Sequence, residues 1–219
     1  LEAPEPEAYQ PKDFLGCDLG IVNILADSDG KIYSGATING LRKRHAKLRA
    51  KLQRKGTHSA KRLLQNRRRK ESRFARNINH CISKQVVAKA LDTSRGIALE
   101  DLQGIRDRIN VRRGQRRQHH SWAFLQLGSF ISYKARLSGT PVVLVDPRNT
   151  SRTCPTCGLV DKANRVSQSW FSCTSCGYSG LADVIAAGNI ARRALGIGRT
   201  LASRPIGKAA SLRDLVSSR

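Results

Sequence analysis

Residues 149–190 read NTSRTCPTCGLVDKANRVSQSWFSCTSCGYSGLADVIAAGNI, a stretch with two Cys-x-x-Cys pairs and a following acid, Asp183. The pairs are separated by fifteen residues and consist of Cys154, Cys157, Cys173 and Cys176. Four thiolates at this spacing can surround one Zn²⁺ tetrahedrally, with each sulfur at about 2.3 Å. Because sulfur fills all four ligand positions, the stretch predicts a closed, structural zinc ribbon over residues 151–180.

Two disulfides are the alternative interpretation of these cysteines. Disulfide frameworks are typical of short secreted chains, whereas no apolar signal segment precedes this stretch and no run approaches the roughly eighteen apolar residues of a membrane span. The expected location is therefore a reducing cytoplasm, with no membrane partner. In that compartment the two other cysteines, Cys17 and Cys81, are expected to be small buried apolar side chains.

The charge balance points to a polyanionic partner. The 219 residues include 40 Lys and Arg against 16 Asp and Glu, which gives a formal net charge of +24. An excess of this size indicates binding to nucleic acid. Apolar residues make up 39% of the chain, enough for a genuine core, which excludes a disordered basic tail.

The beginning of the chain predicts a linker followed by a strand hairpin. Residues 1–13 contain three prolines among polar and acidic neighbours and are typical of an extended linker. The run FLGCDLGIVNILADS at 14–28 is apolar and β-prone, an Asp-Gly dipeptide follows, and KIYSGATI at 31–38 resumes the pattern. Asp-Gly is a strong hairpin signal, so two or three antiparallel strands are expected, with Asp18 inside the first.

A basic helical hairpin is expected over residues 41–92. Apolar residues recur there at helical spacing on both sides of a break at Gly56-Thr57, and the second helix is expected to be the longer. Segment 42–76 carries sixteen Lys or Arg and a single acid, Glu71. Such a charge run is often a solvated face, but like charges at this density repel each other. Neutralisation by nucleic-acid phosphates is therefore the favoured interpretation.

The rest of the chain completes an α/β pattern. The further expected elements are a short buried strand from Gly96 to Glu100, a basic loop over 104–120, a helix over 121–137, a strand over 141–146, a helix over 181–198 and a polar tail over 199–219. The inward face of the helix at 121–137 is expected to carry Trp122, Phe124, Leu125, Phe130, Ile131 and Leu137. This order predicts a mixed sheet with flanking helices, built from residues 14–150 and 181–198 and interrupted by the ribbon.

Three acids occupy related positions in this pattern. Asp18 lies in the first strand, Glu100 ends a central strand and Asp183 begins the last helix. In a compact sheet their carboxylates could converge, where they would repel one another unless a divalent cation held them. Oxygen ligands suit Mg²⁺ or Mn²⁺, and two such ions about 3.5–4 Å apart can activate water against a phosphodiester.

Each acid also has an ordinary structural explanation. Asp183 is well placed as a helix N-cap, Glu100 could be a surface acid beside Asp101, and hydrogen bonds in a turn could hold Asp18. The set of three favours the metal site more strongly than any single member does.

The acids and cysteines lie within motifs that resemble a known family. GCDLGIVN at 16–23, IALEDLQGIR at 97–106 and the stretch at 149–190 are similar to the three RuvC motifs and the zinc ribbon of TnpB-type transposon-encoded nucleases. These nucleases, also called OrfB zinc-ribbon proteins, are the presumed ancestors of type V CRISPR effectors. The resemblance runs from about Gly16 to Leu195, which corresponds to the C-terminal nuclease part of such proteins.

The resemblance implies an RNase H-like (RuvC) fold and a metal-dependent DNA endonuclease of a transposable element, directed by a guide RNA in its full-length form. It assigns catalysis and binding of Mg²⁺ or Mn²⁺ to Asp18, Glu100 and Asp183, zinc ligation to the four cysteines, and a supporting role to Asn189. The alternatives are a non-catalytic nucleic-acid-binding remnant or regulator of transposition and, more remotely, a ribosome-associated basic zinc protein.

Overall fold

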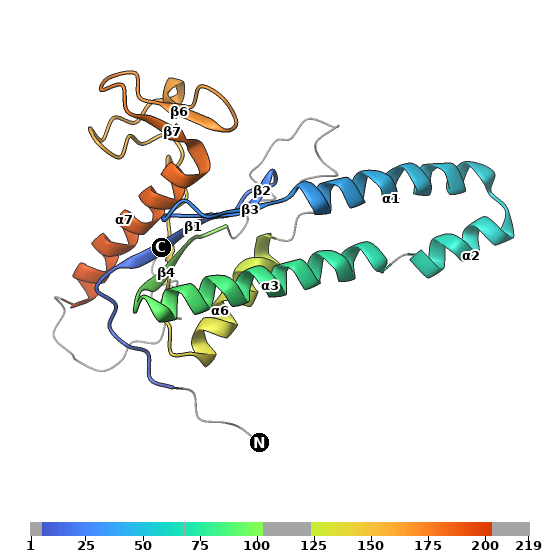
Figure 1. Cartoon of the computed structure of the whole chain (residues 1–219), viewed down its shortest axis with the longest axis horizontal. Helices are drawn as coiled ribbons and strands as arrows, with labels where there is room; N and C mark the ends of the chain where they lie inside the picture. Colours follow the sequence, from blue (N-terminus) through green and yellow to red (C-terminus); the bar gives the residue numbers. More distant parts are fainter. Residues whose placement is uncertain (1–5, 68, 103–123, 203–219) are drawn as a thin grey trace, which may run out of the picture.

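The computed structural model of the chain describes residues 6–67, 69–102 and 124–202. A five-stranded sheet lies at the centre, a long helical arm extends from one side, and a small two-stranded unit, here called the ribbon, adjoins the start of the last helix (Figure 1). The strands of the central sheet are β1 (Phe14–Asp18), β2 (Asn23–Asp27), β3 (Ile32–Ser34), β4 (Gly96–Glu100) and β5 (Val142–Val145). The helices are α1 (Ala36–Lys55), α2 (His58–Arg67), α3 (Lys70–Asp92), α6 (Phe124–Leu137) and α7 (Ala182–Ala202), and the ribbon carries a 3₁₀ turn (Lys162–Asn164), β6 (Trp170–Ser172) and β7 (Ser179–Leu181). The basic loop expected over 104–120 and the tail beyond residue 202 lie outside the described residues.

The strand hairpin expected near the start of the chain is confirmed. β1 pairs antiparallel with β2, and β2 pairs antiparallel with β3. The Asp-Gly turn between β2 and β3 closes with a hydrogen bond from Gly30 N to Asp27 O of 3.1 Å, and Gly30 has a φ of 90°. Glycine adopts this left-handed backbone without the steric cost that a Cβ brings.

Parallel pairing completes the sheet in the order β3-β2-β1-β4-β5. β4 lies parallel to β1 on one side and to β5 on the other. Parallel neighbouring strands need long crossover connections. Helices α1 to α3, which follow β3 and precede β4, lie in the connection that brings β4 back beside β1. The predicted mixed α/β sheet with flanking helices is confirmed.

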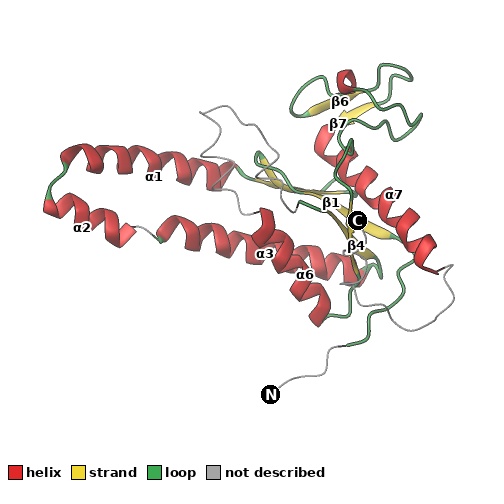
Figure 2. Ribbon diagram, turned by 180° about the vertical axis from the view of Figure 1, so that it is seen from behind, coloured by secondary structure: helices red, strands yellow, loops and turns green. Residues whose placement is uncertain are grey.

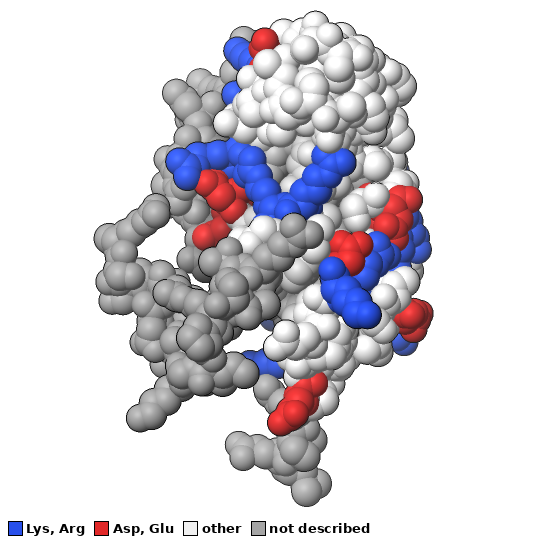
Figure 3. Space-filling model, turned by 90° about the vertical axis from the view of Figure 1, so that its left-hand side faces the viewer, with Lys and Arg blue, Asp and Glu red and all other residues white. Residues whose placement is uncertain are grey.

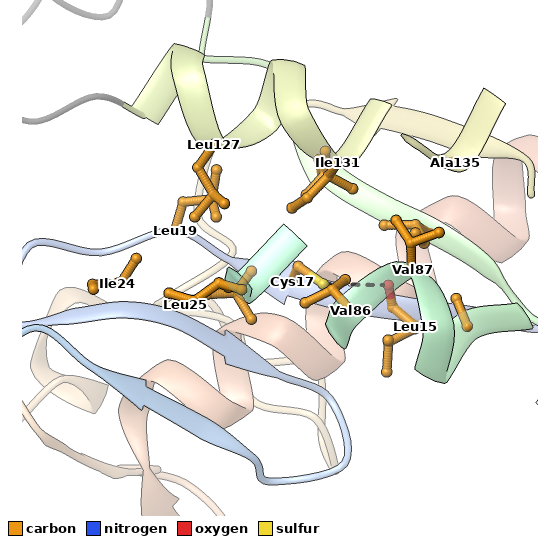
Figure 4. Packing of buried hydrophobic residues seen from close by; sticks show 14 of the residues in the cluster. Leu15, Cys17, Leu19, Ile24, Leu25, Val86, Val87, Leu127, Ile131 and Ala135 are labelled. Atoms are coloured by element: carbon orange, nitrogen blue, oxygen red, sulfur yellow. Dashed lines mark hydrogen bonds between the residues drawn. The ribbon is translucent and has the colours of Figure 1, made fainter. Parts of the chain in front are cut away.

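Side chains of β1 alternate between the two faces of the sheet, and each face has its own helical cover. Leu15 and Cys17 point into a core formed with α3 and α6 (Figure 4), and burial raises the pKa of the Cys17 thiol well above its usual range. Phe14 and Gly16 face α7 instead. Figure 2 shows α7 on the opposite side of the sheet from α3 and α6. Each fully buried Leu or Ile contributes about 1.5–3 kcal/mol to folding, so the two cores hold the sheet between its helical layers.

Gly16 lets α7 approach β1 closely. A Cβ at this position would overlap the backbone carbonyl oxygen of Ala187 and lie 2.7 Å from the backbone nitrogen of Ala191. Only a residue without a side chain fits between the strand and the helix backbone. This contact brings the start of α7, with Asp183, over the face of β1 to which Asp18 belongs.

The basic arm consists of three helices rather than the two expected. α1 ends at Gly56, where the break was predicted and φ is 66°. The second half contains α2, which ends at Arg67, and α3, which begins at Lys70 after a turn at Arg69, whereas the sequence predicted one longer helix. Glu71 at the start of α3 lies 3.7 Å from Arg42 Nε and 3.5 Å from Arg49 Nη2, and these contacts join α3 to α1.

Three further expectations about side chains and ends need correction. On α6 the buried row is Leu127, Ile131 and Ala135, spaced four apart to meet α3, while Leu125 and Leu137 are 51% and 62% exposed. Phe130 is half-buried and stacks on His80 of α3, with ring centroids 4.0 Å apart. Cys81 is exposed, although the sequence predicted it to be buried. Helix α7 extends to Ala202 rather than ending at residue 198. Trp122, also expected on the inward face of the helix at 121–137, lies outside the described residues.

Lys89 of α3 neutralises the charge of Asp27, whose carboxylate is fully buried. Its Nζ lies 2.6 Å from Asp27 Oδ2 and 2.8 Å from Asp29 Oδ2. Replacing Lys89 by methionine keeps the apolar stem but leaves Asp27 without its cation, so the free energy of unfolding should fall by about 3 kcal/mol. Urea denaturation measures the loss. Lys84→Met, on the exposed side of α3, serves as the control; equal stability of the two variants contradicts the prediction.

Candidate functional site

The ribbon is built from two turns of the same design. In the first, Gly158 N donates to Cys154 O at 3.1 Å; in the second, Gly177 N donates to Cys173 O at the same distance. Both glycines are left-handed, with φ of 76° and 73°. Each turn thereby directs its two cysteine side chains toward the other turn.

The four sulfurs form one cluster. The Sγ atoms of Cys154 and Cys176 lie 3.5 Å apart, as do those of Cys157 and Cys173, and all four lie within 4.8 Å of one another. Sulfurs around one zinc ion are roughly 3.8 Å apart when each Zn–S bond is about 2.3 Å, whereas a disulfide bond is about 2.05 Å. All four cysteines are free thiols. The cluster is therefore compatible with a zinc ion and not with two disulfides.

Polar and apolar contacts hold the two turns together. Asn164 is fully buried; its amide donates to Arg152 O and Leu159 O, and its carbonyl accepts from Thr174 N. Phe171 is also fully buried, in a small core that includes Cys154. Burial opposes ionisation of the Cys154 thiol, but the backbone N–H groups of Cys157 and Thr156 bring its pKa down to about 6. A thiol with a lowered pKa loses its proton readily to become a metal ligand.

Asp18 and Glu100 end neighbouring strands on the same face of the sheet. The parallel register pairs Cys17 with Leu99, so these two acids follow side by side. Because side chains alternate along a strand, both belong with Gly16 and Ala98 to the face that α7 covers.

Asp183 lies in the first turn of α7, over that same face. Its Oδ2 accepts from Asn23 Nδ2 of β2 at 2.8 Å, and its Oδ1 lies 3.4 Å from Arg165 Nη2 in the ribbon. The carboxylate of Asp183 is thus held by two other elements. The structure brings together all three acids that the sequence singled out.

Mutual repulsion and burial act on the acids. Burial, then the charges of Glu100 and Asp183, raise the pKa of Asp18 to about 8, against the opposing charge of Arg165. Burial also raises the pKa of Glu100, against the hydrogen bond from Thr150. A pKa raised in this way marks a carboxylate that lacks sufficient positive charge nearby, which a divalent cation would supply.

The three carboxylates are spread more widely than the sulfurs. Among the described residues, the cysteine cluster is the group of Cys, His, Asp and Glu ligand atoms that all lie within 4.8 Å of one another. Two oxygens on one Mg²⁺ are at most about 4.2 Å apart, since each Mg–O distance is about 2.1 Å. The acids as placed therefore do not close around a single ion.

Three residues of this site were not singled out by the sequence: Asn23, Thr150 and Arg165. Thr150 Oγ1 donates to Glu100 Oε1 at 2.5 Å, and Asn23 and Arg165 contact Asp183. They lie between 18 and 160 positions from their partners along the chain. All three fall within the motifs quoted above, and the sequence offers no other signal for them.

Arginines of α7 join it to its surroundings. Arg192 Nη1 donates to Pro155 O in the first turn of the ribbon, and Arg193 Nη1 donates to Asp146 O after β5. Figure 3 shows basic side chains gathered below a largely uncharged ribbon surface. In this view one basic group lies just below the ribbon, and a second group, interleaved with acidic side chains, lies lower on the right.

Comparison with known proteins gives matches along most of the chain. Residues 1–104 match a family model described as "Probable transposase" (OrfB_IS605), and residues 124–190 match the Cas12f1-like TNB domain. A TnpB-like protein of Methanocaldococcus jannaschii is 30% identical over 210 residues, which cover 89% of this chain and 75% of that protein. The CRISPR-associated endodeoxyribonuclease Cas12f1 of Sulfoacidibacillus thermotolerans is 40% identical over 125 residues, covering 57% of this chain and 28% of that protein.

Solved structures show the same fold. A Cas12f1–sgRNA–target DNA complex matches with a TM-score of 0.62 and 20% identity, covering 85% of this chain and 51% of that one. A CRISPR–Cas12f ternary complex matches with a TM-score of 0.65 and 21% identity, covering 95% and 42%.

The mixed sheet, its helical layers and the four-cysteine ribbon define an RNase H-like protein of the RuvC class, as predicted. Within that class, the chain belongs to the TnpB family, which is related to type V CRISPR effectors. It spans 28% and 36% of the length of the two Cas12f1 proteins it matches, those of Sulfoacidibacillus thermotolerans and Syntrophomonas palmitatica. Among the described residues, no helix is long and apolar enough to cross a membrane.

Proposed function

We propose that this chain is the nuclease part of a metal-dependent DNA endonuclease of a transposable element, directed by a guide RNA in its full-length form. The observation that carries the proposal is the meeting of Asp18, Glu100 and Asp183 at one end of the sheet, on the face under α7. Relatives named as endodeoxyribonucleases, and a structural neighbour named as a complex with sgRNA and target DNA, support it.

In this proposal the three carboxylates hold Mg²⁺ or Mn²⁺. The ions supply an activated water and stabilise the leaving oxygen of a phosphodiester. Asn23 and Arg165 orient Asp183. Arg165 adds a positive charge beside Asp183, which partly offsets the negative charge of the acids that a phosphodiester would approach.

The remaining features have roles in binding and stability. The basic arm, α1 to α3, binds nucleic-acid backbone through exposed Lys and Arg side chains of segment 42–76, whose sequence carries sixteen such residues. The four cysteines bind one structural Zn²⁺. Residues 14–150 and 181–198 form the nuclease domain, residues 151–180 the zinc ribbon and residues 1–13 a linker. Thiolate ligands fit the reducing cytoplasm that the sequence favoured.

A second candidate is a nucleic-acid-binding remnant or regulator of transposition that no longer cuts. The spacing of the acids favours it, since as placed they do not close around one ion. In that case the arm and the ribbon retain their functions and the acids are inherited without a role.

Cleavage assays separate the two candidates. Labelled single-stranded and duplex DNA is incubated with the zinc-loaded chain in Mg²⁺, Mn²⁺ or EDTA, with and without RNA transcribed from the neighbouring locus. Cleavage that requires the metal and is lost in Asp18→Ala supports the nuclease, and an RNA requirement supports guidance. Binding without cleavage in every condition supports the remnant.

A further inference from the structure

Thr150 links Glu100 to the ribbon. Its side chain is buried, and Oγ1 lies 2.5 Å from Glu100 Oε1 and 3.1 Å from Pro147 O. A hydroxyl has one proton to donate. The shorter distance and the charge on the acceptor favour donation to the carboxylate, since charge-assisted hydrogen bonds are about twice as strong as neutral ones.

Asn189 of α7 fixes the backbone on which Thr150 stands. Its buried amide nitrogen donates to Thr150 O and to Thr153 O, each at 2.8 Å. Thr153 immediately precedes Cys154, the first cysteine of the cluster. The Asn189 side chain thereby connects Thr150, which contacts Glu100, to Thr153 at the start of the ribbon, here called the ribbon entrance.

The segment between these two carbonyl groups is closed by its own hydrogen bonds. Thr153 Oγ1 donates to Asn149 O at 2.7 Å, and Thr153 N donates to the same oxygen at 3.1 Å. Asn149 has a φ of 61°, a left-handed conformation that asparagine adopts more readily than most residues and that closes the turn on which Thr150 follows. Movement of the ribbon entrance should therefore carry Thr150 with it.

We propose that Thr150 is the positioning residue for Glu100, and that Asn189 transmits the position of the first cysteine turn to Thr150. The order of the ribbon thereby determines the affinity of the carboxylate site for a divalent cation. This inference rests on the proposed function, because it assumes that Glu100 is a metal ligand. The ribbon would then influence metal binding by the carboxylates, in addition to binding its own zinc ion. Residues in the outer shell of a metal site commonly contribute 10- to 100-fold in affinity by orienting the ligands.

The test compares Thr150→Val, which has the same shape without the hydroxyl, with Thr150→Ser, which keeps it. The dissociation constant for Mn²⁺ is measured by electron paramagnetic resonance on zinc-loaded protein, together with zinc content and melting temperature. Thr150→Val should weaken Mn²⁺ binding about 10- to 100-fold at unchanged zinc content, and Thr150→Ser should remain within about threefold of the parent. Equal Mn²⁺ affinity of the parent and Thr150→Val overturns the proposal, and so does an equal loss in both variants, because then the shape at this position matters and not the hydroxyl.

A double-mutant cycle tests the part assigned to Asn189. If Asn189→Ala acts through Thr150, it should weaken Mn²⁺ binding by itself and add nothing to Thr150→Val. Multiplicative losses would show that the two residues act independently and would overturn the link.

The outcomes distinguish this inference from the proposed function. Mn²⁺ binding that depends on Asp18, without DNA cleavage, rejects the nuclease but leaves the positioning role intact. Cleavage and Mn²⁺ binding that are indifferent to Thr150→Val reject the positioning role alone. A parent protein that binds no Mn²⁺ rejects both.

Discussion

Asp183→Ala is expected to reduce metal-dependent DNA cleavage by about 10³-fold or more, equivalent to about 4 kcal/mol of transition-state stabilisation. The substitution removes one of three carboxylates and releases Asn23 and Arg165, which contact it from β2 and the ribbon. DNA affinity should stay the same or rise slightly, because a negative charge facing phosphate is lost. Single-turnover cleavage and filter binding, performed on the same preparation, measure the two effects separately.

Asp92→Ala provides the matched control. Asp92 is an exposed acid at the end of α3, so its removal changes net charge by the same amount away from the three acids. It should cleave like the parent. Unchanged cleavage by Asp183→Ala would remove Asp183 from the site, and a parallel loss of DNA binding would point to misfolding rather than to chemistry.

Cys173→Ser is expected to empty and unfold the ribbon. Apparent binding free energies of structural zinc are about 10–16 kcal/mol in small zinc-binding peptides, so loss of one of four sulfur ligands removes the main source of order in a unit with one short hairpin. Zinc content should fall from about one per chain toward zero. Amide hydrogen exchange should rise throughout β6 and β7 while the central sheet remains protected.

Cys81→Ser separates ligand loss from a general effect of removing a thiol. Cys81 is exposed on α3, remote in sequence from the cluster. That variant should keep the parent's zinc content and hydrogen exchange. If Cys173→Ser also retained zinc and protection in β6, the structural role of the metal would have to be abandoned.

Local patterns predicted the strands, the end of α1 and the ends of α3 and α6, but not the start of α1 at Ala36, ahead of the expected 41, or the division into α2 and α3. The Asp-Gly turn, the apolar runs of β1 and β2 and the break at Gly56 all depend on residues close together in the chain, and the structure has them as expected. The same reasoning misjudged α6. Leu125 and Leu137 are as apolar as Leu127, and only the position of α3 determines which row is buried.

The candidate site also contains features that the sequence predicts and features that only the fold determines. An acid at the end of a predicted strand is visible in sequence, and the period of two places Asp18 and Glu100 on one face once their strands are neighbours. Their catalytic roles stay predictions. Thr150, Asn23 and Arg165 could not be assigned by pattern, because polar residues in loops carry no periodic signal and their partners are brought together by the fold.

The close packing of α7 on Gly16 also affects when the domain can be completed during synthesis. β1 leaves the ribosome well before the helix that covers its second face, because that helix begins at Ala182, more than 160 residues later. At about 5–20 residues per second, that face waits on the order of ten to thirty seconds for its cover. Asp18 is present throughout this interval and Glu100 for about its second half, but Asp183 and Asn189 are not. Under the proposed function, a chain still in synthesis can bind nucleic acid through its basic arm well before it can cleave DNA.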